Sequence, residues 1–307
     1  MRPLGALCVV VLAGGEGRRL ADLTRDPTGR IVPKQFFEFH GKDSLLKRTL
    51  GRIALLPRPV RLLAMVQEAH RRWWGSGRYG LDPRDVVAEP ANRGTGVAIL
   101  HATYRTLERD RDPCLLVLPS DHGTEDEDAW IRTLERAVAG AMADRDHPVL
   151  VGMRPPDDEG YGWIMAGPKA PGGTHHVAAF LEKPAPWQAA ALRGRGALCS
   201  TFAFASSAVA LLRLYQRHAP ALVASFARFA VEWDTAPATR AQAFAALPFC
   251  DFSRDLLEPA RGEVRVLPGE PCGWSDLGTP ARLERWSRRA SEPVETPLAT
   301  AAGLLTA

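Results

Sequence analysis

Short apolar runs, rich in β-branched residues, alternate along this 307-residue chain with longer segments whose apolar residues recur every three or four positions. The short runs predict strands and the longer segments predict helices. We expect strands at residues 7–12, 60–66, 86–88, 115–118, 148–152, 161–165, 177–181, 201–204 and 264–267. We expect helices at residues 44–55, 95–109, 128–143, 186–192 and 206–217, and Ala-rich helical segments up to residue 246. This alternation predicts an α/β fold, a Rossmann-like mixed, mostly parallel sheet flanked by helices.

The domain organisation that follows is simple. Hydrophobic residues make up 46% of the chain, enough to bury a full core, and the elements follow one another without a linker. We therefore expect one domain over residues 1–290. Residues 291–307 mix Pro, Thr and Ala without periodicity and predict a disordered tail.

Charge and cysteine content restrict the partners and the compartment. The 39 basic and 35 acidic residues are spread along the chain without a basic stripe, so no nucleic-acid partner is expected. The apolar run after Arg2 imitates a signal peptide but leads directly into a glycine loop, and no later run is long enough to cross a membrane. Five widely spaced cysteines indicate reduced thiols and therefore a cytoplasmic protein. The sequence also leaves a homo-oligomer open.

The glycine loop directly after the first strand reads Leu12-Ala13-Gly14-Gly15-Glu16-Gly17-Arg18-Arg19-Leu20. Glycines let the backbone N–H groups approach phosphates closely, and Arg19 can neutralise their charge. The spacing matches neither the P-loop nor the dinucleotide fingerprint, and a purely structural turn would also explain it.

Two lysines stand in short motifs. Only five lysines occur in this arginine-rich chain, and two of them lie in Pro33-Lys34-Gln35-Phe36 and in Phe180-Leu181-Glu182-Lys183-Pro184. A lysine in such a chain can mark a position that needs a compact point charge, although chance explains the distribution equally well. Glu182 and Lys183 also fit an exposed ion pair of little energetic value.

These motifs, taken in order with four others, resemble the sugar nucleotidyltransferases, and mannose-1-phosphate guanylyltransferases most of all. The shorter cytidylyltransferases of isoprenoid synthesis share the glycine loop and Pro-Lys-Gln but lack the later motifs. The further matching segments are Glu89-Pro90-Ala91-Asn92-Arg93-Gly94-Thr95, Leu118-Pro119-Ser120-Asp121-His122, Gly160-Tyr161-Gly162-Trp163-Ile164 and Gly273-Trp274-Ser275-Asp276-Leu277-Gly278.

The resemblance implies transfer of a nucleotidyl group from a nucleoside triphosphate, GTP above others, to mannose 1-phosphate or a related hexose 1-phosphate, with release of pyrophosphate. It implies Mg²⁺, or Mn²⁺ in its place, on Asp121 and Asp276, and a catalytic set of Arg19, Lys34, Asp121 and Asp276. The implied nucleotide-binding residues are Leu12, Ala13, Gly14, Gly15, Gly17, Arg19, Lys34, Glu89, Arg93 and Thr95. The implied sugar-phosphate residues are Gly162, Glu182 and Lys183.

Several of these residues also have plain structural interpretations. Asp121 could cap the helix expected nearby, Asp276 could be a turn residue and Trp274 could belong to the core. His175-His176 predicts an exposed turn rather than a metal site. The acidic residues 125–128 predict a stabilised helix start.

The chain also departs from the family's usual motifs. Cys199 and Thr201 stand where an Asn and a Gly are usual, which suggests a sugar preference shifted from mannose, unless both side chains pack behind the sheet. Gly94 and Gly96 depart from the usual Asn-Thr-Ala-Pro, so CTP or dTTP remain alternatives to GTP. A catalytically silent, nucleotide-sugar-binding regulator is the other hypothesis, which the joint presence of Lys34, Asp121, Lys183 and Asp276 disfavours.

Overall fold

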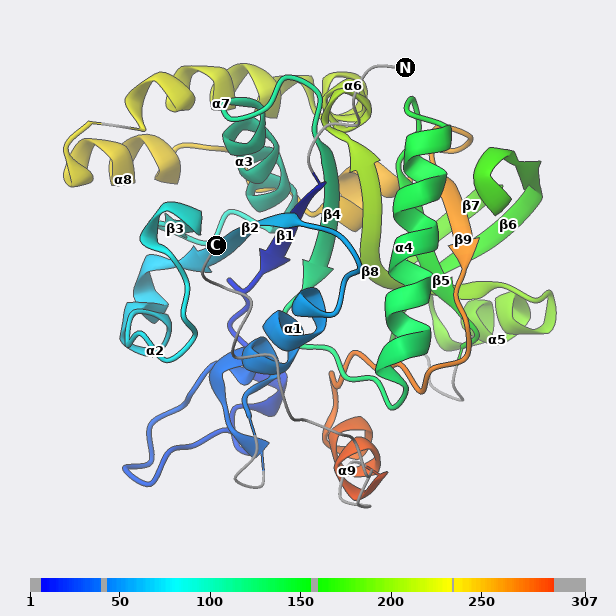
Figure 1. Ribbon diagram of the computed structural model, residues 1–307, viewed down its shortest axis with the longest axis horizontal. Coiled ribbons are helices and arrows are strands. Elements are labelled where there is room, and N and C mark those ends of the chain that lie inside the picture. The colour runs from blue at the N-terminus through cyan, green and yellow to red at the C-terminus, as the bar shows by residue number, and fades with distance from the viewer. Residues whose placement is uncertain (1–6, 40–42, 156–159, 234, 290–307) are drawn as a thin grey trace.

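A nine-stranded sheet with helices on both faces forms the centre of the molecule (Figure 1). The computed structural model describes residues 7–39, 43–155, 160–233 and 235–289. The strands follow the order β3-β2-β1-β4-β8-β5-β9-β7-β6, and β6 pairs with β8 as well. Their bounds are β1 Leu7–Leu12, β2 Val60–Gln67, β3 Val86–Glu89, β4 Cys114–Pro119, β5 Val149–Met153, β6 Gly162–Ala170, β7 Thr174–Glu182, β8 Leu198–Ser207 and β9 Arg265–Pro268.

The sheet is mixed, as the sequence predicted, with its parallel part concentrated in the first half. Strands β1 to β4 pair in parallel, and so do β5 and β9. Strand β8 runs antiparallel to β4, β5 and β6, and β7 is antiparallel to β6 and β9. The sheet is therefore more evenly mixed than expected, because hydrophobic alternation reveals that a strand exists but does not fix its direction.

Both faces of the sheet are buried. Along β1, Cys8 and Val10 pack into one hydrophobic cluster, whereas Leu7, Val9 and Val11 pack into another on the opposite face. Helices α3, α6 and α7 cover the first face, and α1 and α4 cover the second. Their bounds are α1 Leu45–Ala54, α3 Thr95–Leu107, α4 Glu127–Ala143, α6 Ala208–His218 and α7 Pro220–Glu232.

The expected helices are all present, together with some that were not expected. Helix α5 (Pro186–Gly194) and helix α8 (Pro237–Ala245) match expected helical segments. The expectation missed α2 (Arg71–Trp74), a π-helix labelled η7 (Phe252–Leu257) and α9 (Pro280–Arg289). The tail expected at 291–307 lies outside the described residues.

Two local interpretations are settled by the fold. His175 and His176 do not form an exposed turn, because they belong to β7 and pair with Val266 and Arg265 of β9. The acidic segment does start a helix, since the Asp126 carboxylate accepts the Ala129 N–H at 2.9 Å and caps α4. Asp121 is therefore not the cap of this helix.

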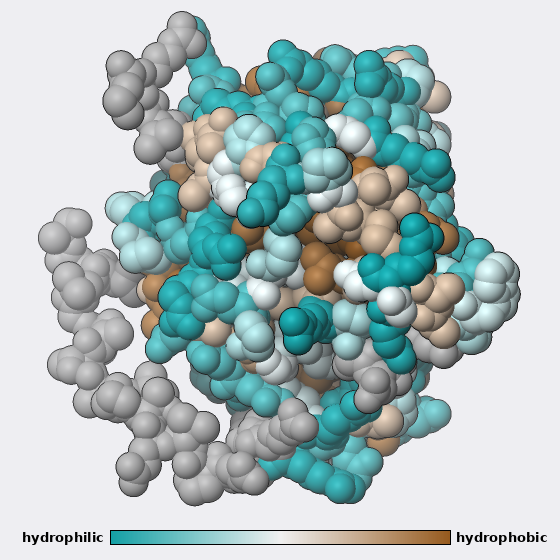
Figure 2. Space-filling model, turned by 90° about the vertical axis from the view of Figure 1, so that its right-hand side faces the viewer, coloured by the Kyte–Doolittle hydropathy of each residue, from teal (hydrophilic) through white to brown (hydrophobic). Residues whose placement is uncertain are grey.

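The surface carries no sign of a membrane-spanning helix. Within the described ranges, no helix combines the length and apolar character needed to cross a bilayer. The side of the molecule seen in Figure 2 is covered mainly by hydrophilic residues, with hydrophobic ones gathered toward its middle. All five cysteines are free and buried, as the sequence indicated.

Candidate functional site

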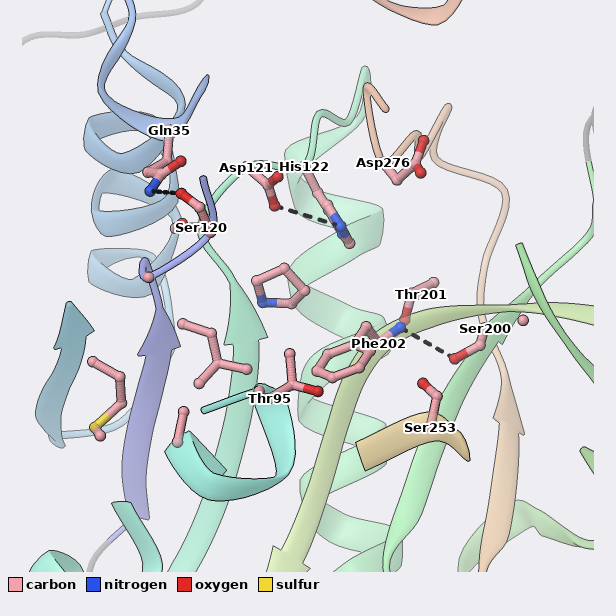
Figure 3. A pocket seen from close by; sticks show the side chains of 18 of the residues that line it. Gln35, Thr95, Ser120, Asp121, His122, Ser200, Thr201, Phe202, Ser253 and Asp276 are labelled. Atoms are coloured by element: carbon pink, nitrogen blue, oxygen red, sulfur yellow. Dashed lines mark hydrogen bonds and ion pairs between the residues drawn. The ribbon is translucent and has the colours of Figure 1, made fainter. Parts of the chain in front are cut away.

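A pocket of about 360 Å³ opens where the parallel strands β1 to β4 end. This is the edge at which ligands bind in open α/β sheets, because the loops that follow the strands surround a cleft there. In Figure 3, Asp121, His122 and Asp276 lie on one side of the pocket, and Thr95, Phe202 and Ser253 lie on the other. Its lining includes the expected residues Leu12, Gly14, Gly15, Arg19, Glu89, Thr95, Asp121, Gly162, Glu182, Lys183 and Asp276.

The glycine loop is held in shape by the segment that contains Lys34. The Gln35 side-chain amide donates hydrogen bonds of 2.8 Å to the carbonyl oxygens of Ala13 and Gly15. Gly17 has φ +66°, and a Cβ there would lie 2.8 Å from the Lys34 backbone nitrogen. The two motifs therefore form one unit, in which Gly17 allows both the left-handed turn and the close approach.

Lys34 joins both acidic loops of the pocket. Its Nζ lies 3.1 Å from Asp121 Oδ2 and 2.5 Å from the carbonyl oxygen of Asp276, and its side chain is 5% exposed. Burial acts to raise the pKa of the Asp121 carboxyl, but the charges of Lys34 and His122 and the hydrogen bonds to the carboxylate together outweigh it, and the pKa lies below its usual value. Asp121 is consequently ionised at neutral pH.

A short backbone bridge brings the two carboxylates together. Gly123 and Ser275 exchange two N–H···O hydrogen bonds of 2.9 Å, which pairs the loop after β4 with the loop before α9. The Arg282 guanidinium then holds Asp276 by a 2.7 Å contact between Nη1 and Oδ1. Asp276 also accepts the Gly278 N–H at 3.0 Å, so the turn interpretation holds alongside its place in the pocket.

The two carboxylates that the resemblance assigns to a metal both belong to the pocket lining. Among the described residues, no group of three or more His, Cys, Asp or Glu side chains could hold a metal. Mg²⁺ typically takes one or two carboxylates and completes its shell with water and substrate phosphates. Asp121 and Asp276 match that requirement.

The side of the pocket formed by β2 and β3 carries polar but uncharged groups. Glu89 is 3% exposed, and burial raises the pKa of its carboxyl to about 8. Its Oε1 lies 3.3 Å from His101 Nδ1, and burial lowers the pKa of that imidazole to about 3. Gln67 Nε2 donates to Glu89 Oε2 at 3.3 Å. At neutral pH these groups offer hydrogen bonds without net charge.

The glycines at 94 and 96 have a packing reason. A Cβ on Gly96 would overlap the Sγ of Cys250, and one on Gly94 would overlap its carbonyl oxygen. The Gly96 N–H donates to that carbonyl at 2.9 Å, and Cys250 N–H donates to the Arg93 carbonyl at 3.0 Å. Glycine is therefore needed at positions 94 and 96 because residues 249–253 pack directly on the 93–96 loop and leave no room for a side chain there.

The expected sugar-phosphate residues lie together on the β6–β7 hairpin. Gly162 pairs with Glu182, and a Cβ on Gly162 would lie 2.7 Å from Glu182 Oε2. Lys183 Nζ contacts Glu182 Oε1 at 2.9 Å, so the ion pair exists, and Lys183 remains 53% exposed beside the pocket. Lys183 and Phe202, both in the pocket lining, have φ of +48° and +60°, which non-glycine residues adopt mainly at constrained functional sites.

The hypothesis that Cys199 faces a sugar hydroxyl is wrong. Cys199 is fully buried in the core, and its sulfur faces the carbonyl oxygen of Met153 at 3.4 Å. Thr201 lies at a β-bulge and reaches the pocket lining, but its hydroxyl donates to the Val151 carbonyl at 2.8 Å and accepts the Ala203 N–H at 3.1 Å. Cys199 therefore packs behind the sheet, and the Thr201 hydroxyl supplies hydrogen bonds to backbone groups at the bulge.

Some expected residues lie behind the pocket lining, and some lining residues were not expected. The pocket lining does not include four of the expected residues: Ala13, Gly17, Lys34 and Arg93. It also includes Asn92, Ser120 and Tyr161, which stand in the matching segments but were given no role of their own. Four more lining residues lie outside those segments: Gln67, Ser200, Phe202 and Ser253. Trp274 is 9% exposed, so it is both core and lining.

The fold and the pocket define an α/β protein with a ligand cleft at the carboxyl ends of its parallel strands. Residues 8–292 match the family model described as Nucleotidyl transferase, and the chain belongs to this family.

Named relatives agree with this family. The chain is 36% identical over 178 residues to the xanthan biosynthesis protein XanB of Xanthomonas campestris, a match that covers 57% of this chain and 36% of the relative. It is 33% identical over 180 residues to a putative mannose-1-phosphate guanylyltransferase of Vibrio cholerae, covering 57% and 37%. These matches thus span little more than a third of the length of the curated relatives.

A solved structure shares the fold over most of the chain. It is titled mannose-1-phosphate geranyltransferase, from Thermus thermophilus, and superimposes with a TM-score of 0.76 at 28% identity. The superposition covers 92% of this chain and 79% of that one. The predicted fold class is confirmed.

The contact between Gly96 and Cys250 can be tested by paired substitutions. We expect Gly96→Ala to lower the free energy of unfolding by about 1–3 kcal/mol, because the added methyl overpacks against the sulfur. Adding Cys250→Ala should recover part of that loss. Urea denaturation of the single and double variants measures the coupling. Gly51→Ala, in open space on α1, is the matched control and should be neutral or stabilising; strictly additive effects would contradict the contact.

The raised pKa of Glu89 predicts a dependence of stability on pH. Its folded pKa of about 8 exceeds the ordinary 4.5, so the folded chain retains a proton that the unfolded chain has lost. This contribution is fully present below pH 4.5 and is lost as the pH rises to 8, by at most about 1.4 kcal/mol per pH unit. Urea unfolding at pH 5 to 8 should show that Glu89→Gln removes this fall, whereas Glu284→Gln on the surface does not. Equal slopes in the wild type and Glu89→Gln would refute it.

Proposed function

We propose that this protein transfers a nucleotidyl group from a nucleoside triphosphate to a sugar 1-phosphate and releases pyrophosphate. The observation that carries the proposal is the Lys34 contact, which places one ammonium between two acidic loops beside a glycine loop. GTP and mannose 1-phosphate are the first candidate substrates, since the Vibrio cholerae relative is named as a mannose-1-phosphate guanylyltransferase.

The reaction explains why these groups are needed. An oxygen of the sugar phosphate attacks the α-phosphorus in line with the departing pyrophosphate, so two polyanions must be brought together. Arg19 and Lys34, with the N–H groups of the glycine loop, would offset the charge that develops. Neither a covalent enzyme intermediate nor a general base is required, because the attacking phosphate oxygen is already ionised.

The pocket divides naturally between the two substrates. The nucleotide would lie against the glycine loop, Glu89 and Thr95, where the groups are neutral or provide N–H donors. The sugar phosphate would lie against Gly162, Glu182 and Lys183. When bound by Asp121 and Asp276, Mg²⁺ would supply positive charge next to the phosphates. The free, buried thiols support a cytoplasmic location.

A pyrophosphate-release screen tests this function directly. The four common ribonucleoside triphosphates and dTTP are each combined with a panel of hexose 1-phosphates in the presence of Mg²⁺. We expect turnover, greatest with GTP and mannose 1-phosphate, because the Vibrio cholerae relative is named for that pair. Tight binding of a nucleotide sugar without any turnover would contradict the enzyme proposal and favour a regulatory binding protein.

Removal of either carboxylate should abolish most turnover. We expect Asp121→Asn and Asp276→Asn to lower kcat on the order of a hundredfold or more, since each removes a charge that holds the metal next to the reacting phosphates. Asp144→Asn is the matched control, because Asp144 is a half-buried partner of Arg265 away from the pocket. Steady-state kinetics with varied Mg²⁺ provides the measurement, and full activity in excess chelator would disprove the metal's role.

A further inference from the structure

The π-helix η7 crosses from the expected nucleotide side of the pocket to the expected sugar side. At its start, the Phe252 N–H donates to Thr95 Oγ1 at 3.1 Å. Just after its end, Glu258 Oε1 accepts the Glu182 N–H at 2.6 Å. A π-helix is rare and often occurs at functional sites. Here its two ends are fastened to the two motifs that the proposed function assigns to different substrates.

Ser253 is the residue of η7 that enters the pocket. It is 3% exposed and belongs to the pocket lining. Its backbone N–H donates to Asp251 Oδ1 at 2.9 Å, which fixes the start of the helix. Its hydroxyl forms no hydrogen bond with any described part of the chain, and Figure 3 shows it directed into the pocket. A hydroxyl that faces the pocket from an otherwise buried residue, without a partner in the described chain, is a group that a ligand would satisfy.

A second hydroxyl lies on the same side of the pocket. Ser200 Oγ accepts the Phe202 N–H at 3.2 Å, which leaves its own O–H available as a donor. Ser200 and Ser253 both belong to the pocket lining and are labelled in Figure 3. The residue before it, Cys199, pairs with Trp163 of β6, which brings Ser200 close to Gly162 of the expected sugar-phosphate motif. Ser200 therefore lies toward the sugar side, and Ser253 lies next to Phe252, where η7 leaves Thr95 and runs toward Glu182.

We propose that Ser253 is a specificity-determining residue whose hydroxyl hydrogen-bonds a ring hydroxyl of the sugar 1-phosphate. This inference rests on the proposed function. Ser253 lies outside the glycine-loop and Glu-Lys-Pro motifs. Its place in the pocket follows from the path of η7. A hydroxyl on the sugar that is absent or inverted would leave the buried Ser253 hydroxyl unpaired, and the enzyme would discriminate against it.

The experiment combines Ser253→Ala with sugar 1-phosphates that each lack one hydroxyl. With the preferred sugar, we expect Ser253→Ala to lower kcat/KM for the sugar 1-phosphate about tenfold and leave the KM for the triphosphate unchanged. One monodeoxy analogue should lose about the same factor with the wild type and nothing further with the variant, because both changes remove the same hydrogen bond.

Controls separate this from a structural effect. Ser206→Ala removes another fully buried hydroxyl on β8, one that donates to the Ser207 carbonyl, and should leave both KM values unchanged. Thermal melts show whether each variant folds. If the wild type is active and Ser253→Ala ranks the sugar 1-phosphates by kcat/KM as the wild type does, the inference is overturned. A rise in KM confined to the triphosphate would also overturn it, because the Ser253 hydroxyl would then contact the ribose. An inactive wild type would instead reject the proposed function.

Discussion

The ammonium group of Lys34 is the contact on which the pocket depends. It lies between the Asp121 carboxylate and the Asp276 carbonyl, although these residues are far apart in the chain. The glycine loop is attached to the same segment through Gln35. A single short stretch, 33–36, therefore fixes the distance between the glycine loop and both acidic loops. Because a buried ammonium must be paired, the fold cannot separate these loops without leaving a charge uncompensated.

Much of the fold could be predicted because its signals are local. The strand β1 and the glycine loop after it occupy consecutive residues, so alternation and composition reveal both. Helix α9 also had a local signal, the apolar pair Leu283 and Trp286 three residues apart, but it follows a segment without clear alternation and was not predicted. Strand direction was less accessible, since β8 enters between β4 and β5 through pairing that only the complete sheet determines.

The candidate site divides in the same way. Lys34, Asp121 and Asp276 could be named from the resemblance, because each stands in a short motif, and the structure brings them together. Gln67 and Ser253 could not be named, since they line the pocket only because of how β2 and η7 pack in the complete fold. The mistaken role of Cys199 has the same origin. One residue along a strand reverses the face to which a side chain points, and a bulge at Thr201 makes that face impossible to infer from alternation.

The glycines at 94 and 96 show how a changed motif can be compensated elsewhere. Read alone, they leave CTP and dTTP as alternatives to GTP. In the fold, the space that two side chains would have occupied is filled by the backbone and sulfur of Cys250. The loop is then held by backbone hydrogen bonds to Cys250 and by the Thr95 hydroxyl, which accepts the Phe252 N–H. Since those residues lead directly into η7, the same packing that stabilises the 93–96 loop also fixes the start of η7, which carries Ser253 of the pocket lining. A substitution at either glycine would thus act on both halves of the pocket.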